Sequence, residues 1–339
     1  MTTGSDLPPA QAILRMISGA WIAQAIFVAA KLGIADLLRD RPRSPEALAE
    51  AVQMHPRALY RILRALASVG VFSVDEAGRF HNTPLSEALR SDRPDSIRPY
   101  AIMAGSEWVW RSWGEIMHSV RTETSAFEKV YGASLFEHHA KDPESARIFS
   151  EGLTSRSRPE DAAVVSAYDF SAAGAIVDVA GGQGTLLAAI LAANPAARGI
   201  LFEMPHVVAM SQATLEQAGV AERCTLVDGD IFVSIPKGGD IYLLKKIIHD
   251  FYDPEAHKIL RTVREAIPPH GRLLLIELVI PAGNEASFSK LLDLLMLVYP
   301  GGRERTEVEY GSLLASAGFK MTRVLPTTST VSLVEAVPV

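Results

Sequence analysis

Cysteine is nearly missing from this sequence, whose 339 residues include only Cys224. A disulfide within the chain and a cysteine-rich metal site are therefore excluded. A strong excess of charge is missing too, because 33 basic and 39 acidic residues give a net charge of −6, which does not favour nucleic acid as a partner. The longest apolar run near the N-terminus, residues 21–30, is shorter than the roughly 20 residues that cross a bilayer. We interpret this run as a buried helix and expect no membrane contact.

The first ten residues contain neither the basic nor the apolar segment of a signal peptide. Together with the lone cysteine, this predicts a protein of the reducing cytoplasm. The composition is otherwise ordinary for a globular protein, with 48% hydrophobic and 21% charged residues. A chain of this length is expected to form two domains.

The first hundred residues predict a winged-helix layout. Apolar residues recur at helical spacing from 11 to 39, and Ser44 with Pro45 then marks the start of a helix at 46–52. A second helix is predicted at 57–69, followed by two short strands at 71–74 and 79–81 around a turn. We therefore place a helical, winged-helix domain at residues 1–100 and a helical linker that contributes to a substrate pocket at 101–170.

A winged helix can also bind DNA, and Arg57, Arg61 and Arg64 fall on one face of its second helix. Residues 1–100 contain 12 basic and 10 acidic residues, however, and a net charge of +2 is weak for a DNA-binding domain. A DNA-binding regulator is therefore the less favoured alternative.

From residue 171 to the end, apolar runs of strand length alternate with helices. This alternation is typical of a parallel sheet covered on both faces, and it predicts an α/β, Rossmann-like domain with a mostly parallel seven-stranded sheet. The last two strands, 319–325 and 330–336, are predicted to form an antiparallel hairpin at the sheet edge. The other predicted strands are 175–180, 199–203, 224–227, 240–244 and 272–280, and the predicted helices are 185–193, 206–218 and 255–266.

A glycine turn, DVAGGQG at Asp178–Gly184, follows the first of these strands. Glycines allow the tight strand-to-helix turn and let a ligand approach the backbone closely. The dinucleotide fingerprint G-x-G-x-x-G fails, because Leu187 stands where the third glycine would be. A cofactor with a pyrophosphate is therefore disfavoured.

Acidic side chains follow two later strands. Glu203 ends the second strand, 21 residues after Gly182, where a carboxylate can accept both hydroxyls of a ribose. Asp230 follows the third strand, and the apolar Ile231 and Phe232 behind it could hold an adenine. A glycine turn with these two acids and no phosphate site suits an adenosyl thioether cofactor.

These residues resemble a known family, the S-adenosylmethionine-dependent O-methyltransferases of small molecules, of the plant caffeate, bacterial antibiotic and hydroxyneurosporene types. The resemblance covers nearly the whole chain and includes an N-terminal winged-helix domain through which that family forms homodimers. Six motifs carry it in order: DVAGGQG at Asp178–Gly184, FEMPHV at Phe202–Val207, GDIF at Gly229–Phe232, LKKIIHDF at Leu244–Phe251, ELVIP at Glu277–Pro281 and GGRERT at Gly301–Thr306.

The resemblance implies a class I methyltransferase fold with S-adenosyl-L-methionine as cofactor, S-adenosyl-L-homocysteine as product and no metal. It implies that His249 is the general base and that Glu277 and Glu304 bracket it. The implied cofactor-binding residues are Ala180, Gly181, Gly182, Gly184, Glu203, Asp230, Ile231, Phe232 and Lys245.

Three positions depart from the family pattern. Ala180 stands where many members have a further glycine, and Glu203 where plant members usually have aspartate. Phe251 replaces a common tryptophan, which is expected to alter packing near the adenine.

Methyl transfer to a phenol needs a base, because a phenolic hydroxyl has a pKa near 10 and is mostly protonated at pH 7. His249 follows the fourth strand, at the sheet edge where the cofactor is expected, and a histidine there can take the proton. A carboxylate on its other ring nitrogen would fix the tautomer, and Glu277 on the neighbouring strand can reach it.

Alternative roles remain for these side chains. His249 and Asp250 could be two metal ligands, although no further ligand follows at a recognisable spacing. Glu304 lies between Arg303 and Arg305 and could equally belong to a solvated charge run.

The acceptor pocket is predicted from side-chain type alone. Methionine and aromatic side chains suit flat apolar ligands, although the same side chains would serve equally in a core or a dimer interface. His138 and His139 are predicted to lie on a helix surface. The pocket candidates are Met103, Trp108, Trp110, Asp250, Leu295, Met296 and Tyr299.

We therefore predict an enzyme that transfers a methyl group from S-adenosylmethionine to a hydroxyl, in the first instance phenolic, of a small aromatic or polyketide-like secondary metabolite. One alternative is a family member with other chemistry, either N-methylation or cofactor binding without methyl transfer. The other alternative is the winged-helix regulator.

Overall fold

The computed structural model describes residues 7–339 of the chain. It divides into two compact units. The N-terminal unit comprises the chain up to Arg111 and Phe136–Arg156, and the sheet unit comprises Ser112–Leu135 and Ser157–Val339. The segment 101–170, interpreted above as a linker, is thus divided between the two units.

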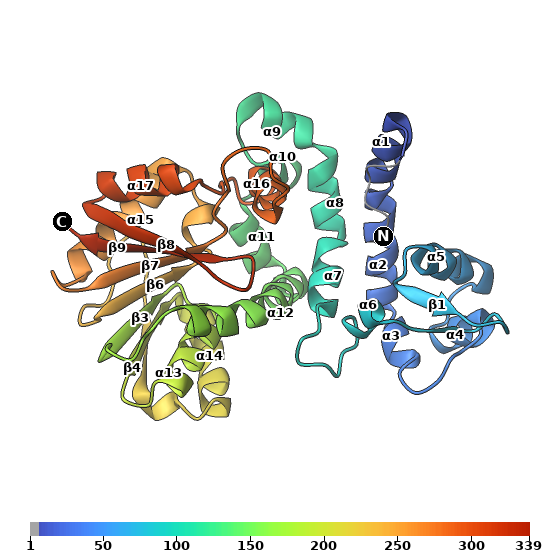
Figure 1. Ribbon diagram of the computed structural model, residues 1–339, viewed down its shortest axis with the longest axis horizontal. Coiled ribbons are helices and arrows are strands. Elements are labelled where there is room, and N and C mark those ends of the chain that lie inside the picture. Colours follow the sequence, from blue (N-terminus) through green and yellow to red (C-terminus); the bar gives the residue numbers. More distant parts are fainter. Residues whose placement is uncertain (1–6) are drawn as a thin grey trace. The chain divides into compact units, whose positions relative to one another are not determined.

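The N-terminal unit contains the predicted winged helix (Figure 1). Ser44 caps the N-terminus of helix α4, because its side chain accepts a hydrogen bond from the Ala47 N–H, and Pro45 is the first helical residue. Strands β1 and β2 pair antiparallel, and Phe80 also bridges to Arg43. The elements are α1 (Pro9–Ile17), α2 (Gly19–Lys31), α3 (Ile34–Leu37), α4 (Pro45–Ala51), α5 (Pro56–Ser68), β1 (Phe72–Val74), β2 (Phe80–Asn82), α6 (Pro84–Glu87) and α7 (Arg98–Ala104).

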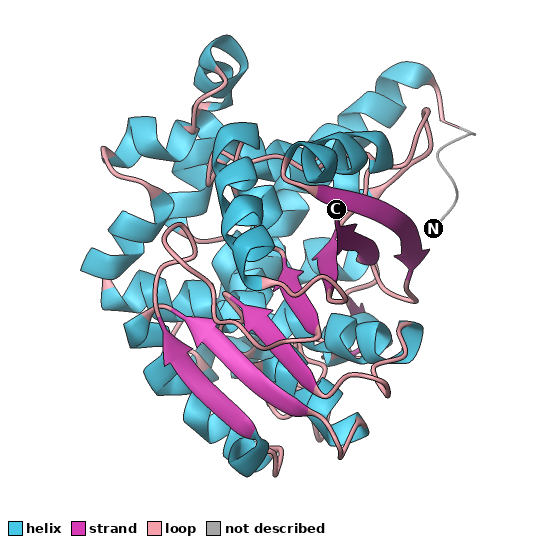
Figure 2. Ribbon diagram, turned by 90° about the vertical axis from the view of Figure 1, so that its left-hand side faces the viewer, coloured by secondary structure: helices cyan, strands magenta, loops and turns pink. Residues whose placement is uncertain are grey.

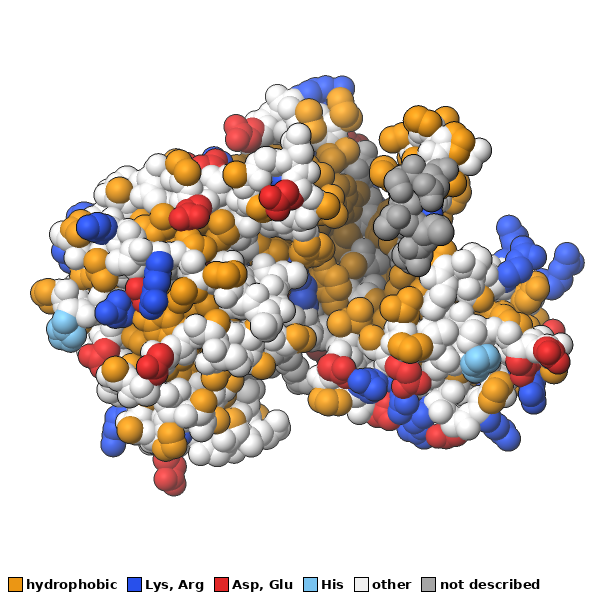
Figure 3. Space-filling model, in the orientation of Figure 1, with side chains coloured by type: hydrophobic (Ala, Val, Ile, Leu, Met, Phe, Trp, Pro, Cys, Tyr) orange, Lys and Arg blue, Asp and Glu red, His pale blue; other side chains and the backbone are white. Residues whose placement is uncertain are grey.

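Residues 21–30 form a helix as predicted, but the helix is only partly buried. Within α2 the buried residues are Ala25, Ala29 and Ala30, while Trp21 is 72% exposed. Large apolar side chains are exposed on α1 as well (Figure 3), namely Ile13, Leu14, Met16 and Ile17. By length and composition alone, the stretch Pro9–Lys31 could cross a membrane. An exposed apolar face of this kind is typical of a surface that binds a partner or a membrane.

The predicted surface position of His139 was also wrong. This side chain is buried, its Nδ1 lies 2.9 Å from the Ser145 hydroxyl, and its ring stacks on Phe149. By contrast, Arg57, Arg61 and Arg64 are all exposed on α5, where blue side chains gather in Figure 3.

Four further helices connect the winged helix with the sheet. Ser125 caps α10 with its hydroxyl, which accepts a hydrogen bond from the Glu128 N–H. The connecting helices are α8 (Glu107–Gly114), α9 (Ile116–Thr122), α10 (Ala126–Tyr131) and α11 (Leu135–Lys141), and the long helix α12 (Pro143–Ala167) follows them.

The sheet unit is a seven-stranded sheet in the order β5-β4-β3-β6-β7-β9-β8, with helices on both faces (Figures 1 and 2). The first five strands pair in parallel, and β9 pairs antiparallel with both β7 and β8, so the predicted edge hairpin is confirmed. The strands are β3 (Ala175–Val179), β4 (Arg198–Glu203), β5 (Cys224–Asp228), β6 (Ile241–Lys245), β7 (Arg272–Glu277), β8 (Phe319–Pro326) and β9 (Ser332–Pro338). The helices are α13 (Thr185–Ala193), α14 (Pro205–Gln217), α15 (Asp253–Ala266), α16 (Phe288–Val298) and α17 (Glu307–Ser316), with single 3-10 turns at η1 (Ala221–Arg223) and η2 (Ile248–Asp250).

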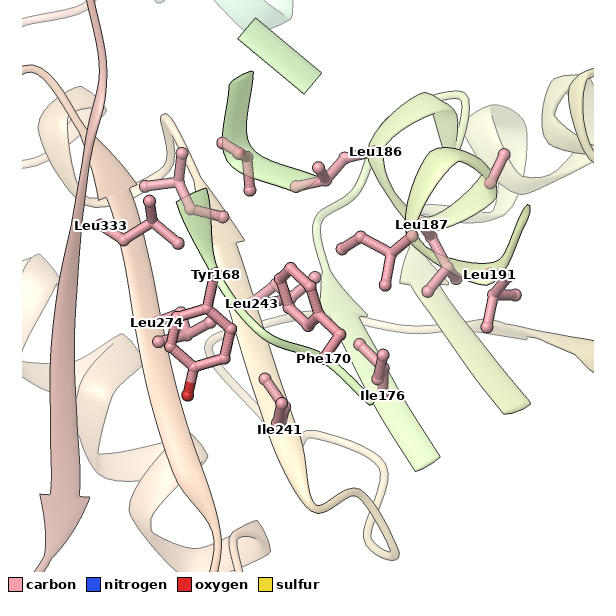
Figure 4. Packing of buried hydrophobic residues seen from close by; sticks show 14 of the residues in the cluster. Tyr168, Phe170, Ile176, Leu186, Leu187, Leu191, Ile241, Leu243, Leu274 and Leu333 are labelled. Atoms are coloured by element: carbon pink, nitrogen blue, oxygen red, sulfur yellow. The ribbon is translucent and has the colours of Figure 1, made fainter. Parts of the chain in front are cut away.

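Alternate residues of each strand enter two hydrophobic cores, one on each face of the sheet. On one face Ile176, Leu243 and Leu274 pack with Leu187 and Leu191 of α13 (Figure 4). On the other face Tyr242 and its neighbours pack against α15 and α17. The near-continuous apolar strands predicted from the sequence are therefore explained by burial on both sides.

The fifth predicted strand, 272–280, ends earlier than predicted. Strand β7 stops at Glu277, and Ile280 instead forms a parallel bridge with Thr306 while its N–H donates to the Arg305 carbonyl at 2.9 Å. The chain leaves the sheet here because it pairs with a different segment. That pairing brings residues 303–306 to the end of β7.

Replacement of Leu243 by alanine is expected to lower the free energy of unfolding by about 2–5 kcal/mol, because the side chain is fully buried in the central strand β6. Urea denaturation followed by far-UV circular dichroism measures this. The matched control is Val233→Ala, at a side chain that is 72% exposed, with an expected change below about 0.5 kcal/mol. Equal effects of the two substitutions would contradict the assignment of Leu243 to the core.

Candidate active site

The candidate site lies where the strand order reverses. The chain runs from β3 outward through β4 and β5, then returns to the other side of β3 with β6 and β7. Ligands of such sheets bind outside the carboxyl ends of the strands at this reversal. The turns that follow β3 and β6 contain the glycine motif and His249.

The glycine turn is shaped by close packing. A Cβ atom on Gly181 would lie 2.5 Å from both the Asp178 carboxyl and Leu201, so a larger residue here would force one of these two buried side chains to move. Ala180, Gly182 and Gly184 all have positive φ angles, which is the left-handed region that disfavours alanine. The departure at Ala180 therefore keeps the backbone shape of the turn at the cost of some strain.

Glu203 holds this turn in place. Its buried carboxylate accepts hydrogen bonds from the Gly182 N–H at 3.0 Å and from the Met204 N–H at 2.8 Å. A carboxylate offers about four acceptor positions, so two remain for the hydroxyls of a ribose.

Asp178 is the first residue of the glycine motif and was not among the predicted cofactor-binding residues. It is buried, and neither carboxylate oxygen has a hydrogen-bond partner among the described residues. Burial, helped by the nearby charge of Asp161, raises the pKa of Asp178 to about 7. A buried carboxylate whose charge is this poorly compensated favours a ligand that supplies donors and positive charge, and S-adenosylmethionine has an ammonium, a sulfonium and two ribose hydroxyls. The residues present therefore fit this cofactor.

Lys245 lies at the end of β6, but its charge is directed toward α12. Its ammonium pairs with Asp161 and lies 3.5 Å from the Glu160 carboxylate, and it donates to the Ser157 carbonyl at 3.3 Å. The next residue, Lys246, has a positive φ angle and pairs with Glu160 at 2.5 Å. The sequence alone could not show these pairings, because the partners of Lys245 in α12 lie more than 80 residues earlier in the chain.

Asp230, predicted to lie at the cofactor site, is in a short turn after β5. The Asp230 carboxylate accepts the Phe232 N–H at 2.8 Å, and Asp230 itself is exposed. Phe232 packs edge-to-face on Phe251, with ring centroids 5.3 Å apart. The departure at Phe251 is therefore in contact with a residue predicted to hold the adenine.

His249 is buried in the 3-10 turn η2, directly after β6. Its Nδ1 lies 2.8 Å from Oε1 of Glu304 and 3.7 Å from Oε2 of Glu277, while its Nε2 lies 3.5 Å from Oδ1 of Asp250. Glu277 accepts the Ile248 N–H at 3.0 Å. The structure thus brings together the three residues that the resemblance implied, and Glu304, rather than Glu277, makes the hydrogen bond to the ring.

Glu304 is only 1% exposed, so it does not belong to a solvated charge run. Its N–H donates to the Asp293 carboxylate of α16 at 2.9 Å. The neighbouring Arg305 is equally buried. Neither Asp293 nor Arg305 was predicted to lie at the site. Arg305 was missed because the alternating charges of 303–305 look like those of an exposed loop, and Asp293 because it is the only acidic residue in a largely apolar helix.

The charges of this cluster are strongly coupled. Burial alone lowers the pKa of His249, but the charges of Glu277 and Asp250 and the hydrogen bond to Glu304 outweigh it and raise the pKa to about 9. Burial raises the pKa of Glu277 to about 7 and that of Asp250 to about 6. Protonation steps therefore belong to the cluster rather than to one residue.

The ligand atoms of His249, Glu277 and Glu304 lie within 4.8 Å of one another, which is close enough to surround a small cation. Sequence spacing did not reveal this grouping, because the three residues come from separate segments. The arrangement is also what an oriented histidine base requires: a buried ring with one nitrogen bound to a carboxylate.

The acceptor-pocket candidates fall in different units. Met103, Trp108 and Trp110 belong to the N-terminal unit, and Asp250, Leu295, Met296 and Tyr299 belong to the sheet unit. Trp108 packs edge-to-face on His139, at 4.8 Å between ring centroids, and Tyr299 packs on Phe127 at 5.7 Å. Their role as a pocket remains a proposal.

Known proteins match both parts of the chain. An O-methyltransferase domain family matches residues 110–320, and an O-methyltransferase dimerisation domain family matches residues 14–92. A phenazine O-methyltransferase of Lysobacter antibioticus is 47% identical over 98% of this chain and 97% of its own length. The mitomycin biosynthesis 6-O-methyltransferase of Streptomyces lavendulae is 40% identical over 92% and 89%. The phenazine-1-carboxylate N-methyltransferase of Pseudomonas aeruginosa is 31% identical over 95% of each chain.

Solved structures agree with these matches. The crystal structure of LaPhzM is 47% identical, covers 98% of this chain and 100% of its own, and superposes with a TM-score of 0.93. The O-methyltransferase NcsB1 from neocarzinostatin biosynthesis, in complex with S-adenosylmethionine and a naphthoic acid, is 33% identical over 94% and 96%, with a TM-score of 0.80. The fold is that of a class I methyltransferase, and the cofactor is S-adenosylmethionine. The chain belongs to the S-adenosylmethionine-dependent O-methyltransferase family of secondary metabolism, with a dimerisation domain preceding the methyltransferase domain.

Proposed function

We propose that this enzyme methylates a hydroxyl, in the first instance phenolic, of a small aromatic or polyketide-like metabolite, with His249 as the general base. The observation that carries the proposal is the buried hydrogen bond between His249 Nδ1 and Glu304. A carboxylate only accepts, so the hydrogen lies on Nδ1 and the neutral ring keeps its lone pair on Nε2. Nε2 is therefore the atom that takes the acceptor proton.

The cofactor supplies an electrophilic methyl group, and the protein supplies position and charge. Glu203, Asp178 and the glycine turn are proposed to hold the cofactor, together with Lys245 and the Asp230–Phe232 turn. His249 removes the hydroxyl proton as the acceptor oxygen becomes nucleophilic. Glu304 and Glu277 then stabilise the imidazolium, because both carboxylates lie within 4 Å of Nδ1.

A hydroxyl acceptor fits this site better than an aromatic ring nitrogen. A ring nitrogen attacks with a free lone pair and has no proton to lose, so an oriented base would have no task. N-methylation is the second candidate, because a relative 31% identical to this chain is named as a phenazine-1-carboxylate N-methyltransferase. Incubation with a hydroxyphenazine or with phenazine-1-carboxylate, followed by NMR of the product to show whether the new methyl group is on oxygen or on nitrogen, separates the two functions.

We further propose that catalysis needs no metal and that the acceptor is a small molecule rather than nucleic acid, in line with the net charge of −6. His249 already uses Nδ1 for Glu304, and this hydrogen bond would be lost if a cation occupied the cluster. Met103, Trp108, Met296 and Tyr299 are proposed to contact the acceptor. A cytoplasmic location remains a prediction.

The apolar surface of α1 and α2 supports a homodimer. Ile17 and Trp21 are large, exposed and inside the segment 14–92 that matches a dimerisation domain. A second copy of the chain would bury this surface.

Replacement of Glu203 by alanine is expected to weaken binding of S-adenosylhomocysteine about 10- to 100-fold, because hydrogen bonds to a charged acceptor are lost. Isothermal titration calorimetry measures this, with NAD as a ligand that should not bind. Glu216→Ala, on the exposed side of α14, is the matched control. Wild-type affinity in the Glu203 variant would remove this residue from the cofactor site.

Replacement of His249 by alanine is expected to lower turnover at least 100-fold while leaving affinity for S-adenosylhomocysteine within about three-fold of wild type. Turnover is measured by liquid chromatography with the acceptor that responds in the hydroxyphenazine screen. His257→Ala, at a histidine of α15 that contacts Ser316, should behave as wild type. Near-normal turnover of the His249 variant would end the general-base assignment.

The pH dependence of kcat/KM is expected to show an activity that rises with pH, with its midpoint near 9, because His249 must lose its proton before it can act. Glu304→Gln should move this midpoint to lower pH by about one unit, since a negative charge that favours the imidazolium is gone. The plateau should fall as well. The same acceptor is used for both enzymes, so its own ionisation cancels, and an unmoved midpoint would contradict the coupling.

Size-exclusion chromatography with light scattering is expected to give twice the chain mass of 36.7 kDa. Trp21→Asp should shift the protein toward the monomer, whereas Val233→Asp, at an exposed apolar residue of the sheet unit, should not. A monomeric wild-type protein that sediments with phospholipid vesicles would instead assign the apolar face to a membrane.

A further inference from the structure

Arg305 is a buried arginine whose side chain points at the backbone beside His249. It is 1% exposed, and its guanidinium donates to the carbonyl of Ile248 at 3.0 Å and to that of Phe251 at 2.9 Å. These two residues lie on either side of His249 and Asp250. The same guanidinium binds Asp253, the first residue of α15, at 3.1 and 2.7 Å. One side chain thus fixes both ends of the turn that contains the proposed base.

The backbone of the 302–305 loop also lies directly on this turn. The Arg303 N–H donates to the His249 carbonyl at 2.8 Å. A Cβ atom on Gly302 would lie 2.0 Å from the same carbonyl, so the close approach requires glycine. Three carbonyls of the turn, those of Ile248, His249 and Phe251, are therefore bound from this single loop.

Glu304 lies between these two anchors. Its backbone N–H is held by Asp293, and its side chain reaches His249 Nδ1. The position of the carboxylate relative to the imidazole therefore depends on how the loop sits on the turn. Arg305 and Glu304 are adjacent in the chain, so a shift of one moves the other.

We propose that Arg305 is a positioning residue that holds the His249 turn in register with Glu304, which rests on the proposed role of His249 as the base. Arginine suits this role because its rigid, planar fork presents several N–H donors in fixed directions. Lysine keeps the charge but has a flexible stem and a single nitrogen, so it cannot reach both carbonyls and Asp253 together. Burying a guanidinium costs desolvation energy, and here the hydrogen bonds that offset this cost go to the His249 turn and to Asp253 at its end.

Several charged groups face His249 besides Glu304. Glu277 approaches from β7 and Asp250 from the turn itself. The positive charge of Arg305 acts to lower the pKa of Glu277, and that of Lys246 acts to lower the pKa of Asp250. The charges of Glu277 and Glu304 in turn help to raise the pKa of Tyr310 on α17. A substitution that preserves charge, Arg305→Lys, therefore separates geometry from electrostatics.

The test is an NMR titration of the full-length protein labelled with 15N-histidine, with the His249 signals assigned from their loss in His249→Gln. In Arg305→Lys the pKa of the His249 imidazole is expected to fall by one unit or more, toward its ordinary value near 6.5, because the contact with Glu304 loosens. Turnover should fall about 10- to 100-fold, with affinity for S-adenosylhomocysteine unchanged. Glu304→Gln should lower the same pKa.

The matched control is Arg303→Lys in the same loop. The Arg303 side chain forms its ion pairs with Glu309 and Asp253 and not with His249 or Glu304, so the imidazole should titrate as in wild type. If Arg305→Lys fails to fold, Asp253→Asn releases the guanidinium from its exposed end and should lower the pKa by a smaller amount.

A wild-type titration curve in Arg305→Lys, or in Asp253→Asn if that variant replaces it, would overturn the proposal. Failure of the base assignment gives a different result, namely normal turnover of His249→Ala. The titration would then still report whether Arg305 holds the pair together, so the two failures are distinguishable.

Discussion

The hydrogen bond between His249 Nδ1 and Glu304 joins segments 55 residues apart, and the arrangement of the site depends on it. His249 lies in the turn that follows β6. Glu304 lies in the loop between the helices α16 and α17, outside the strands of the sheet. For the two to meet, the chain must leave the sheet at Glu277, pair Ile280 with Thr306, and lay the 302–305 loop on the η2 turn. A buried polar group without a partner is costly, and the carbonyls of Ile248, His249 and Phe251 all accept hydrogen bonds from the 303–305 loop.

Electrostatics of the same sheet edge favour a cationic cofactor. Asp178 and Glu203 are buried acids on either side of the glycine turn. Burial disfavours the charged form of Asp178 and raises its pKa. A ligand with positive charge and hydroxyl donors relieves that cost, whereas a pyrophosphate would add to it. The failed dinucleotide fingerprint at Leu187 and the buried carboxylates therefore lead to one conclusion by separate routes.

The strands, the glycine turn and the winged helix could be read from the sequence because each is a local pattern. Apolar runs, helix caps such as Ser44 and the turn residues at 178–184 act on their immediate neighbours, so burial on two faces is visible as near-continuous apolarity. The errors arose where tertiary contacts decide burial. Trp21 was predicted to be buried and is exposed, while His139 was predicted to lie on a helix surface and is buried.

By itself the sequence determined the α/β class, the order of the strands along the chain, the adenosyl character of the cofactor site and the identity of His249 as a candidate base. Only the tertiary structure decided that Glu304 contacts the imidazole while Glu277 fixes the backbone beside it, that Lys245 turns toward Asp161, and that Arg305 is buried beneath the turn. The physical reason is that hydrogen bonding and charge pairing act over about 3 Å in space and take no account of separation along the chain. A charged residue therefore has the same appearance in the sequence whether water or a buried carboxylate is its partner.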